Sequence, residues 1–185
     1  QERVTIYGDY DVDGATSAAL LIRLLRGLGL DAGYYIPDRL MEGYGPSGEA
    51  LVRLAEGGSS LIVTVDCGAQ AFEALAMARA VGVDVIVVDH HKCASALPEA
   101  FALVNPNRLD ESPDGAIHGH LAAVGVAFLL GAALLRELRA RSFFAARAEP
   151  RLIDLLDLVA LGTVADVAQL RGLNRAFVAQ GLKVM

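Results

Sequence analysis

The chain has 185 residues, which is enough for one domain of ordinary size, or for one domain and the start of a second. Hydrophobic residues make up 54% of it and charged residues 21%, a composition that excludes a disordered or fibrous protein. The formal net charge of −6 argues against a protein that binds nucleic acid through a basic surface alone.

Membrane and secreted classes are also disfavoured. The most apolar helical stretch, residues 15–28, contains Arg23 and Arg26 and is too short to span a bilayer, so we expect no membrane segment. Cys67 and Cys93 are too few for a disulfide framework, and we expect both to be thiols in a reducing compartment. No basic leader or apolar signal region precedes the first apolar run, so we expect a cytoplasmic protein.

Short apolar runs alternate with amphipathic stretches over the first hundred residues, which predicts an α/β fold with a mostly parallel sheet flanked by helices. We expect strands over residues 4–7, 33–36, 61–65, 83–88 and 101–104. We expect helices over residues 15–28, 47–55 and 69–81, and glycines at positions 29, 57 and 82 fall where these helices should end.

The pattern changes after Asn105. Residues 105–119 are rich in Pro, Asp and Gly and predict a loop, and helices are expected over 121–141, over 152–161 and from Asn174 to the last residue. Residues 162–165 are expected to form a turn that directs Asp166 inward. The one domain boundary that the pattern suggests lies near Arg171, where a final helix would lead to a further domain.

Acidic residues follow three of the expected strands. Asp9, Asp11 and Asp13 follow the first, Asp66 follows the third, and Asp89, His90 and His91 follow the fourth. Parallel strands bring their carboxyl ends to one edge of a sheet, so these side chains should lie close together. Clustered carboxylates repel one another, which raises their pKa values and opposes their ionisation. A bound cation would offset this repulsion.

The types of these side chains indicate which metal they would bind. Carboxylates and imidazoles without paired cysteines favour Mn²⁺ or Mg²⁺, with zinc as an alternative. The number of acids exceeds the need of one ion, which favours two ions that share a bridging carboxylate, as in many phosphatases and nucleases. The sequence therefore predicts a two-metal phosphoesterase.

Each motif also has a simpler interpretation. The segment from Asp9 to Gly14 resembles a calcium-binding loop, but position 20 is Leu20 where such a loop has glutamate. Asp66 alone resembles the phosphoacceptor of a receiver domain, although a receiver has no use for the Asp-His-His that ends at His91. A lone histidine is usually structural, whereas two adjacent ones behind an aspartate and a strand favour metal ligation.

Four segments resemble, in order and spacing, the four motifs of the DHH phosphoesterase family. They are GDYDVDG at 8–14, VDCG at 65–68, DHH at 89–91 and GTVAD at 162–166. Four further segments resemble the bacterial RecJ branch of that family, the single-strand-specific DNA exonucleases. They are IPDR at 36–39, EGYG at 42–45, NPN at 105–107 and VGVAF at 124–128.

The resemblance implies a five-stranded parallel α/β domain over residues 1–170 and, over 171–185, the start of a linker helix to C-terminal DHHA1 and OB-type domains. It implies hydrolysis of single-stranded DNA from the 5′ end with two Mn²⁺ or Mg²⁺ ions. The implied metal ligands are Asp9, Asp11, Asp13, Asp66, His90 and Asp166. Asp66 would bridge the ions, Asp89 would orient His90, and His91 would face the scissile phosphate. Some members have a histidine where this chain has Tyr7.

Further residues are candidates for holding the substrate. Arg39 and Arg108 can clamp a phosphate, although each can equally form a surface ion pair. The backbone near Gly125 can bind an oxyanion at a helix start, or the glycine can serve close packing. His118 and His120 are expected to be solvent-facing loop residues, with a substrate contact as the alternative.

Two rival functions remain. One is hydrolysis of a small phosphate compound such as pyrophosphate or a cyclic dinucleotide, and the other is a non-catalytic DNA-binding replication scaffold. The complete set of acids and histidines argues against the scaffold. The EGYG segment at 42–45 favours the nuclease, through the resemblance alone.

Overall fold

Five parallel strands form one sheet in the computed structural model, which describes residues 2–185. The strands are β1 (Arg3–Gly8), β2 (Asp31–Tyr35), β3 (Leu61–Val65), β4 (Asp84–Val88) and β5 (Ala102–Val104). Their order across the sheet is β2-β1-β3-β4-β5, and each neighbouring pair is parallel. The expected α/β fold with a parallel five-stranded sheet is confirmed.

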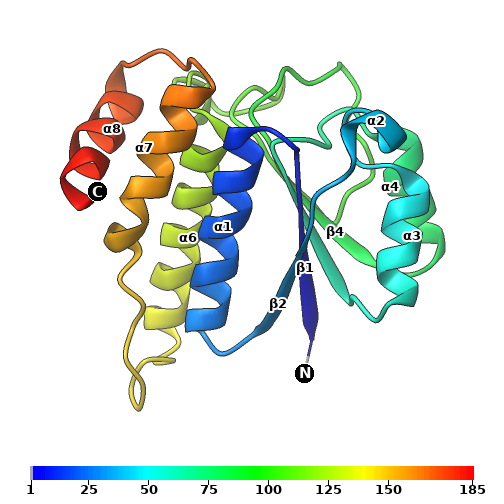
Figure 1. Cartoon of the computed structure of the whole chain (residues 1–185), viewed down its shortest axis with the longest axis horizontal. Coiled ribbons are helices and arrows are strands. Elements are labelled where there is room, and N and C mark those ends of the chain that lie inside the picture. Colours follow the sequence, from blue (N-terminus) through cyan, green and yellow to red (C-terminus); the bar gives the residue numbers. More distant parts are fainter. Residues whose placement is uncertain (1) are drawn as a thin grey trace.

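Helices cover both faces of this sheet (Figure 1). On one face lie α1 (Val12–Gly27) and α6 (Ala123–Ala140), with α7 (Leu156–Ala165) and α8 (Gly172–Val184) outside them. On the other face lie α3 (Gly48–Glu56) and α4 (Phe72–Ala80). Short helical turns complete the chain: α2 (Arg39–Glu42), α5 (Pro113–Ala116) and the 3₁₀ turn η1 (Leu152–Leu155).

Alternation along the strands produces two hydrophobic cores, because successive side chains of a strand point to opposite faces. Val4 and Ile6 of β1 pack in the core under α1 and α6, whereas Tyr7 packs in the core under α3 and α4. Val88 and Val87 of β4 divide in the same way. Both faces of the sheet are therefore buried, which explains its Val- and Ile-rich strands.

The strand order reverses next to β1. The chain passes from β1 to β2 on one side and then returns to β3 on the other. In open parallel sheets, such a switch point separates the loops that leave the two neighbouring strands and opens a crevice at their carboxyl ends. The acidic residues that follow β1 and β3 lie at this crevice.

Several element boundaries differ from the sequence-based expectation. α1 begins at Val12, three residues early, because the Asp11 side chain accepts a hydrogen bond from the Gly14 amide and caps the helix. Residues 162–165 form the last turn of α7 rather than a free turn, so Asp166 is the residue that ends this helix. The loop at 105–119 contains the short helix α5.

The last helix packs closely on the rest of the fold. Asn174, Val178 and Gly181 of α8 are buried, and a Cβ at Gly181 would stand 2.2 Å from the Leu156 carbonyl oxygen of α7. The boundary near Arg171 stays a prediction. Within residues 2–185 no helix is both long and apolar enough to cross a bilayer.

Candidate metal centre

The candidate centre lies at the carboxyl ends of β1, β3 and β4. Asp9 follows β1 directly, Asp66 follows β3 and Asp89 follows β4. All three aspartates are at most 3% exposed. Two helices add side chains from outside the sheet, since α1 carries Asp13 and Asp166 caps the end of α7.

Three groups of side chains have donor atoms within 4.8 Å of one another. They are Asp9 with Asp11 and Asp66, Asp13 with His90 and Asp166, and Asp66 with His90 and His91. The structure thus brings together all six residues that the sequence suggested as ligands. Asp66 belongs to two of the groups and joins the Asp9 side of the cluster to the His90 side, which is the position expected of a bridging carboxylate.

Asp66 is held in an unusual backbone conformation. Its φ of 62° lies in the left-handed region that non-glycine residues seldom adopt, although aspartate tolerates it better than most. Its amide donates a hydrogen bond to the Val88 carbonyl of β4, and the Thr64 hydroxyl donates one to the Cys67 carbonyl. These bonds fix a tight turn that points the Asp66 carboxylate into the crevice.

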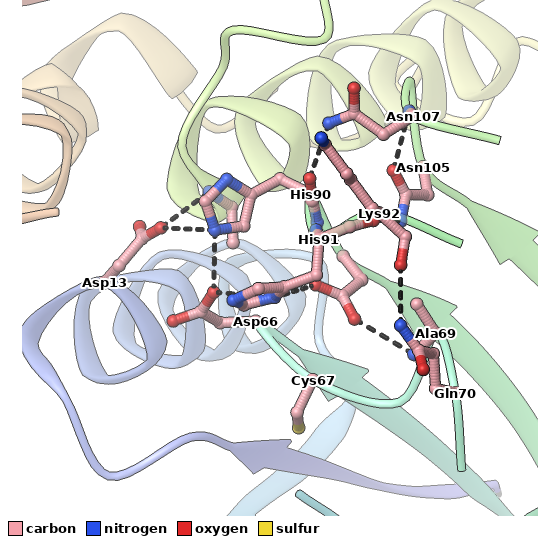
Figure 2. A network of polar contacts seen from close by, with 12 residues as sticks. Asp13, Asp66, Cys67, Ala69, Gln70, His90, His91, Lys92, Asn105 and Asn107 are labelled. Carbon is pink, nitrogen blue, oxygen red and sulfur yellow. Dashed lines mark hydrogen bonds and ion pairs between the residues drawn. The ribbon is translucent and has the colours of Figure 1, made fainter. Parts of the chain in front are cut away.

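Three buried donor or acceptor atoms in the cluster lack a hydrogen bond. They are Oδ1 of Asp9, Oδ1 of Asp66 and Nε2 of His90. Nε2 of His90 lies 3.2 Å from Oδ1 of Asp66 and 4.0 Å from Oδ2 of Asp13, and Figure 2 shows this imidazole between the two carboxylates. Buried polar atoms normally have partners, so this set of oxygen and nitrogen atoms fits divalent cations.

The His90 ring is oriented from behind by a backbone carbonyl. Its Nδ1 lies 3.0 Å from the Leu121 carbonyl oxygen, just before α6. A hydrogen on Nδ1 leaves the Nε2 lone pair free to bind a metal, which is the usual support for a ligating histidine. The expectation that Asp89 orients the His90 ring is therefore wrong.

Asp89 instead holds His91 and the neighbouring turn. Its Oδ1 accepts from the His90 amide at 2.7 Å, the His91 amide at 3.1 Å and His91 Nδ1 at 2.7 Å. Its Oδ2 accepts from the Ala69 amide at 2.9 Å. Asp89 is not among the candidate ligands, and its side chain fixes the position of the His91 ring.

Asp13 caps the start of α6. Its two oxygens accept hydrogen bonds from the Ala123 amide at 2.6 Å and the Val124 amide at 2.9 Å. The Gly125 amide donates to the Ala122 carbonyl, and Gly125 is buried. The expectation that this helix start binds a substrate oxyanion is wrong, because a carboxylate of the protein already takes its amides.

The pKa values of the cluster show the electrostatic cost of packing acids together. Burial raises the pKa of Asp66 to about 8 and that of Asp13 to about 6, and it also raises the pKa of Asp9 and of Asp166. Burial alone would lower the pKa of His90, but the Asp66 carboxylate outweighs it and raises the pKa to about 9. Cations at this site would keep the acids ionised and the imidazole neutral.

An aromatic wall borders the centre. The guanidinium of Arg39 lies 4.8 Å from the centre of the Tyr10 ring, and Tyr44 meets both Tyr10 and His91 edge-on. The Tyr44 hydroxyl is 3.3 Å from Nε2 of His91. Arg39 and Tyr44 are exposed, so both are free to meet a substrate. The sequence argument named Arg39 but missed the tyrosines, because their contacts depend on how two loops meet.

The other suggested substrate residues are engaged elsewhere. Arg108 makes two hydrogen bonds to Asp110, at 2.9 and 2.6 Å, and a third to the Leu103 carbonyl. Three of its donors are used by Asp110 and by the last strand, which disfavours a phosphate clamp. The expectation that His118 and His120 face solvent holds only in part, because both are half-buried and Nε2 of His120 is shielded from solvent against Gly172.

Two asparagines hold the histidine loop, and sequence reasoning gave them no role. The Asn105 side-chain amide donates to the His91 carbonyl at 2.8 Å. The Asn107 side-chain amide donates to the His90 carbonyl, as Figure 2 shows, and also to the Gly119 carbonyl. The Asn-Pro-Asn segment was visible as a motif, but its spacing alone says nothing about which carbonyls it meets.

Comparisons with known proteins point to one family. Residues 3–163 match the DHH family, N-terminal domain. The chain is 47% identical over 184 residues to the single-stranded-DNA-specific exonuclease RecJ of Dickeya dadantii, which covers 97% of this chain and 31% of that protein. A crystal structure of exonuclease RecJ bound to manganese matches with a TM-score of 0.82 at 39% identity, over 98% of this chain and 43% of that one. RecJ in complex with Mn²⁺ from Thermus thermophilus matches with a TM-score of 0.74 at 37% identity, over 98% and 24% of the two chains.

The curated relatives are much longer than this chain. It spans 31% of the Dickeya dadantii protein and 21% of the Bacillus subtilis one, to which it is 41% identical. The matched region contains the whole candidate centre except Asp166, which lies three residues beyond the end of the family match.

Proposed function

Since the chain belongs to the DHH family, we propose that it is the catalytic domain of a metal-dependent exonuclease that hydrolyses single-stranded DNA from the 5′ end in DNA repair and recombination. The observation that carries the proposal is the cluster in which Asp66 joins two groups of buried oxygen and nitrogen donors. Relatives at 41–47% identity that are named single-stranded-DNA-specific exonucleases support the choice of substrate.

We propose that Asp9, Asp11 and Asp66 hold one divalent ion and that Asp13, Asp66, His90 and Asp166 hold the other. Solved relatives that contain Mn²⁺ support manganese, and one in complex with Mg²⁺ keeps magnesium as the alternative. When bound, such a pair of cations neutralises phosphate oxygens and acidifies a water molecule.

The protein's own residues supply the remaining functions. Asp89 fixes the His91 ring, whose side chain is 46% exposed at the mouth of the crevice. A protonated His91 in this position can donate a hydrogen bond to a phosphate oxygen, since the Asp89 carboxylate raises its pKa. Arg39 lies beside Asp9 and offers a second positive charge to the same phosphate.

Domains beyond this chain would bind most of the DNA single strand. The chain's net charge is −6, whereas proteins that bind single strands use basic grooves and stacked aromatic rings. We therefore propose that DHHA1 and OB-type domains complete the DNA-binding surface. The two free cysteines fit a reducing, cytoplasmic location.

The test is hydrolysis by the full-length protein with Mn²⁺ of a 5′-labelled single strand, a 3′-labelled single strand, a duplex, a dinucleotide and pyrophosphate. We expect the 5′-labelled strand to release labelled mononucleotide first and the duplex to resist. Hydrolysis of pyrophosphate or of the dinucleotide alone would replace the nuclease by a small-phosphate enzyme. No Mn²⁺-dependent hydrolysis of any substrate would favour the scaffold.

A further inference from the structure

The segment from Asp38 to Gly45, here called the α2 segment, carries two exposed residues that lie beside the metal centre. Arg39 stacks on Tyr10, and Tyr44 lies edge-on to His91. The segment joins β2 to α3 above the sheet (Figure 1). Any function of Arg39 and Tyr44 at the centre therefore depends on how this segment is held.

Apolar packing does not hold it. No residue of α2 is buried, and Leu40 and Met41 are 92% and 82% exposed. A helix of four residues is far too short to be stable alone, because helix nucleation fixes several residues for each hydrogen bond gained. Its position must come from polar contacts to the rigid elements on either side.

Glu42 supplies those contacts. Its two carboxylate oxygens each lie 2.7 Å from the Tyr35 hydroxyl of β2, and one of them accepts from the Asp38 amide at 3.0 Å. Arg53 of α3 donates to the same Tyr35 hydroxyl at 2.6 Å and lies 3.6 Å from the Glu42 carboxylate. Glu42 thus joins the two ends of α2 to each other and to β2 through charge-assisted hydrogen bonds, and it forms an ion pair with α3.

A second attachment lies at the end of the α2 segment. The buried Tyr7 hydroxyl donates to the Gly45 carbonyl at 3.2 Å, and the Tyr7 ring packs 5.3 Å from that of Tyr35. Gly43 and Gly45 have positive φ values of 79° and 80°, conformations that glycine adopts without cost. Between these attachments, Tyr44 is carried out to His91.

We propose that Glu42 is a positioning residue of the nuclease site, which acts by fixing the α2 segment so that Arg39 and Tyr44 face the substrate at the metal centre. This inference rests on the proposed function. Glu42 is not among the candidate metal ligands, so its removal should misplace the substrate contacts and leave the metals bound.

The test compares Glu42→Ala with Glu49→Ala in the full-length protein with Mn²⁺. Glu49 is exposed at the start of α3, and among the described residues it makes no side-chain hydrogen bond or ion pair, so it is a matched control. For Glu42→Ala we expect the KM for a single strand to rise about tenfold and kcat to change less than about threefold, at unchanged Mn²⁺ affinity. Glu42→Gln keeps an acceptor for Tyr35 and should restore most of the KM.

Hydrogen exchange gives a readout that is independent of activity. The Leu40 and Met41 amides, which donate to the Asp38 side chain, should exchange faster in Glu42→Ala and in the milder Tyr35→Phe than in the control. Unchanged exchange over residues 38–45 would overturn the proposal even if the protein proved not to be a nuclease. An inactive wild-type protein with faster exchange in Glu42→Ala would instead overturn only the proposed function.

A double-mutant cycle tests whether Glu42 acts through Arg39. If it does, Glu42→Ala should raise the KM of Arg39→Ala by a smaller factor than it raises the KM of the wild-type protein, because one of the two contacts that Glu42 positions is already absent. Full additivity of the two effects would contradict positioning through Arg39.

Discussion

His90 and His91 are neighbours in sequence with different surroundings. His90 is supported by the Leu121 carbonyl and directs Nε2 at Asp66, whereas His91 is held by Asp89 and is about half exposed. The sequence placed both at the site but assigned Asp89 to the wrong ring. The path of the chain after β4 decides which of the two imidazoles contacts the Asp89 carboxylate, and the sequence does not reveal that path.

This difference predicts opposite effects of two adjacent substitutions. His90→Ala should remove a ligand and lower Mn²⁺ affinity, whereas His91→Ala should keep both ions and reduce hydrolysis by about a hundredfold. Equilibrium dialysis against Mn²⁺, together with single-strand hydrolysis, measures both. Equal loss of metal in the two variants would show that His91 is also a required ligand.

At the scale of elements, α1, α6 and α7 meet behind the metal centre with little spare room. A Cβ at Gly162 of α7 would lie 2.3 Å from Oγ1 of Thr16, 2.8 Å from Cγ1 of Val124 and 3.0 Å from Oδ1 of Asp13. The glycine of the Gly-Thr-Val-Ala-Asp motif is therefore required by packing, and it lets α7 bring Asp166 to the cluster.

We expect Gly162→Ala to destabilise the protein by about 1–3 kcal/mol and to weaken Mn²⁺ binding, because the added methyl group pushes on Asp13. Gly125→Ala is the matched control in α6: its Cβ would meet only ordinary contacts, the closest at 3.4 Å from Leu121 Cδ2. Alanine also favours a helix by about 1 kcal/mol over glycine. Thermal unfolding compares the two, and similar melting temperatures for both variants would refute the packing argument.

The main elements were predictable from the sequence, and their junctions were not. The strands and the long helices carry strong hydrophobic periodicity, so the sheet and both covering layers followed from it. Periodicity says nothing about capping across the fold. Asp13 looked like one of three equivalent aspartates, and only the approach of α6, more than a hundred residues later, gives it the Ala123 and Val124 amides.

Residues 39–42 show the same limit. They have no hydrophobic periodicity, because α2 has no buried face and depends on Glu42 instead. The motif that contains Glu42 was noticed through resemblance alone. Its physical role became visible only when β2 and α3 placed Tyr35 and Arg53 beside it.

For the whole molecule, the acid cluster makes stability depend on pH and metal together. The pKa of Asp66 is raised to about 8 from 3.8, and that of His90 to about 9 from 6.5. Because the pKa of the Asp66 carboxyl is higher in the folded protein than in the unfolded chain, its ionisation lowers the stability of the fold as pH rises from 3.8 to about 8. The raised pKa of His90 stabilises the fold at low pH, and this stabilisation is lost as pH rises through about 9. Both effects lower the stability of the metal-free protein as pH rises.

Metal-free protein should therefore melt at a lower temperature at pH 9 than at pH 6. The rise in melting temperature caused by Mn²⁺ should grow over the same range, because metal ligands must be deprotonated. Calorimetry of chelator-treated protein with and without Mn²⁺ measures both trends, and Asp66→Asn should flatten them. A metal-free melting temperature that rises from pH 6 to pH 9 would be inconsistent with a buried, uncompensated acid cluster.

The central claim is that Asp66 joins two divalent ions in one site. Electron paramagnetic resonance of the protein titrated with Mn²⁺ tests it most directly, because two Mn²⁺ ions that share a carboxylate are magnetically coupled, whereas separate ions give an ordinary six-line spectrum. We expect two bound ions with a coupled spectrum, and loss of the coupling in Asp66→Asn. A single bound ion, or two ions with the uncoupled spectrum in the wild-type protein, would contradict the account.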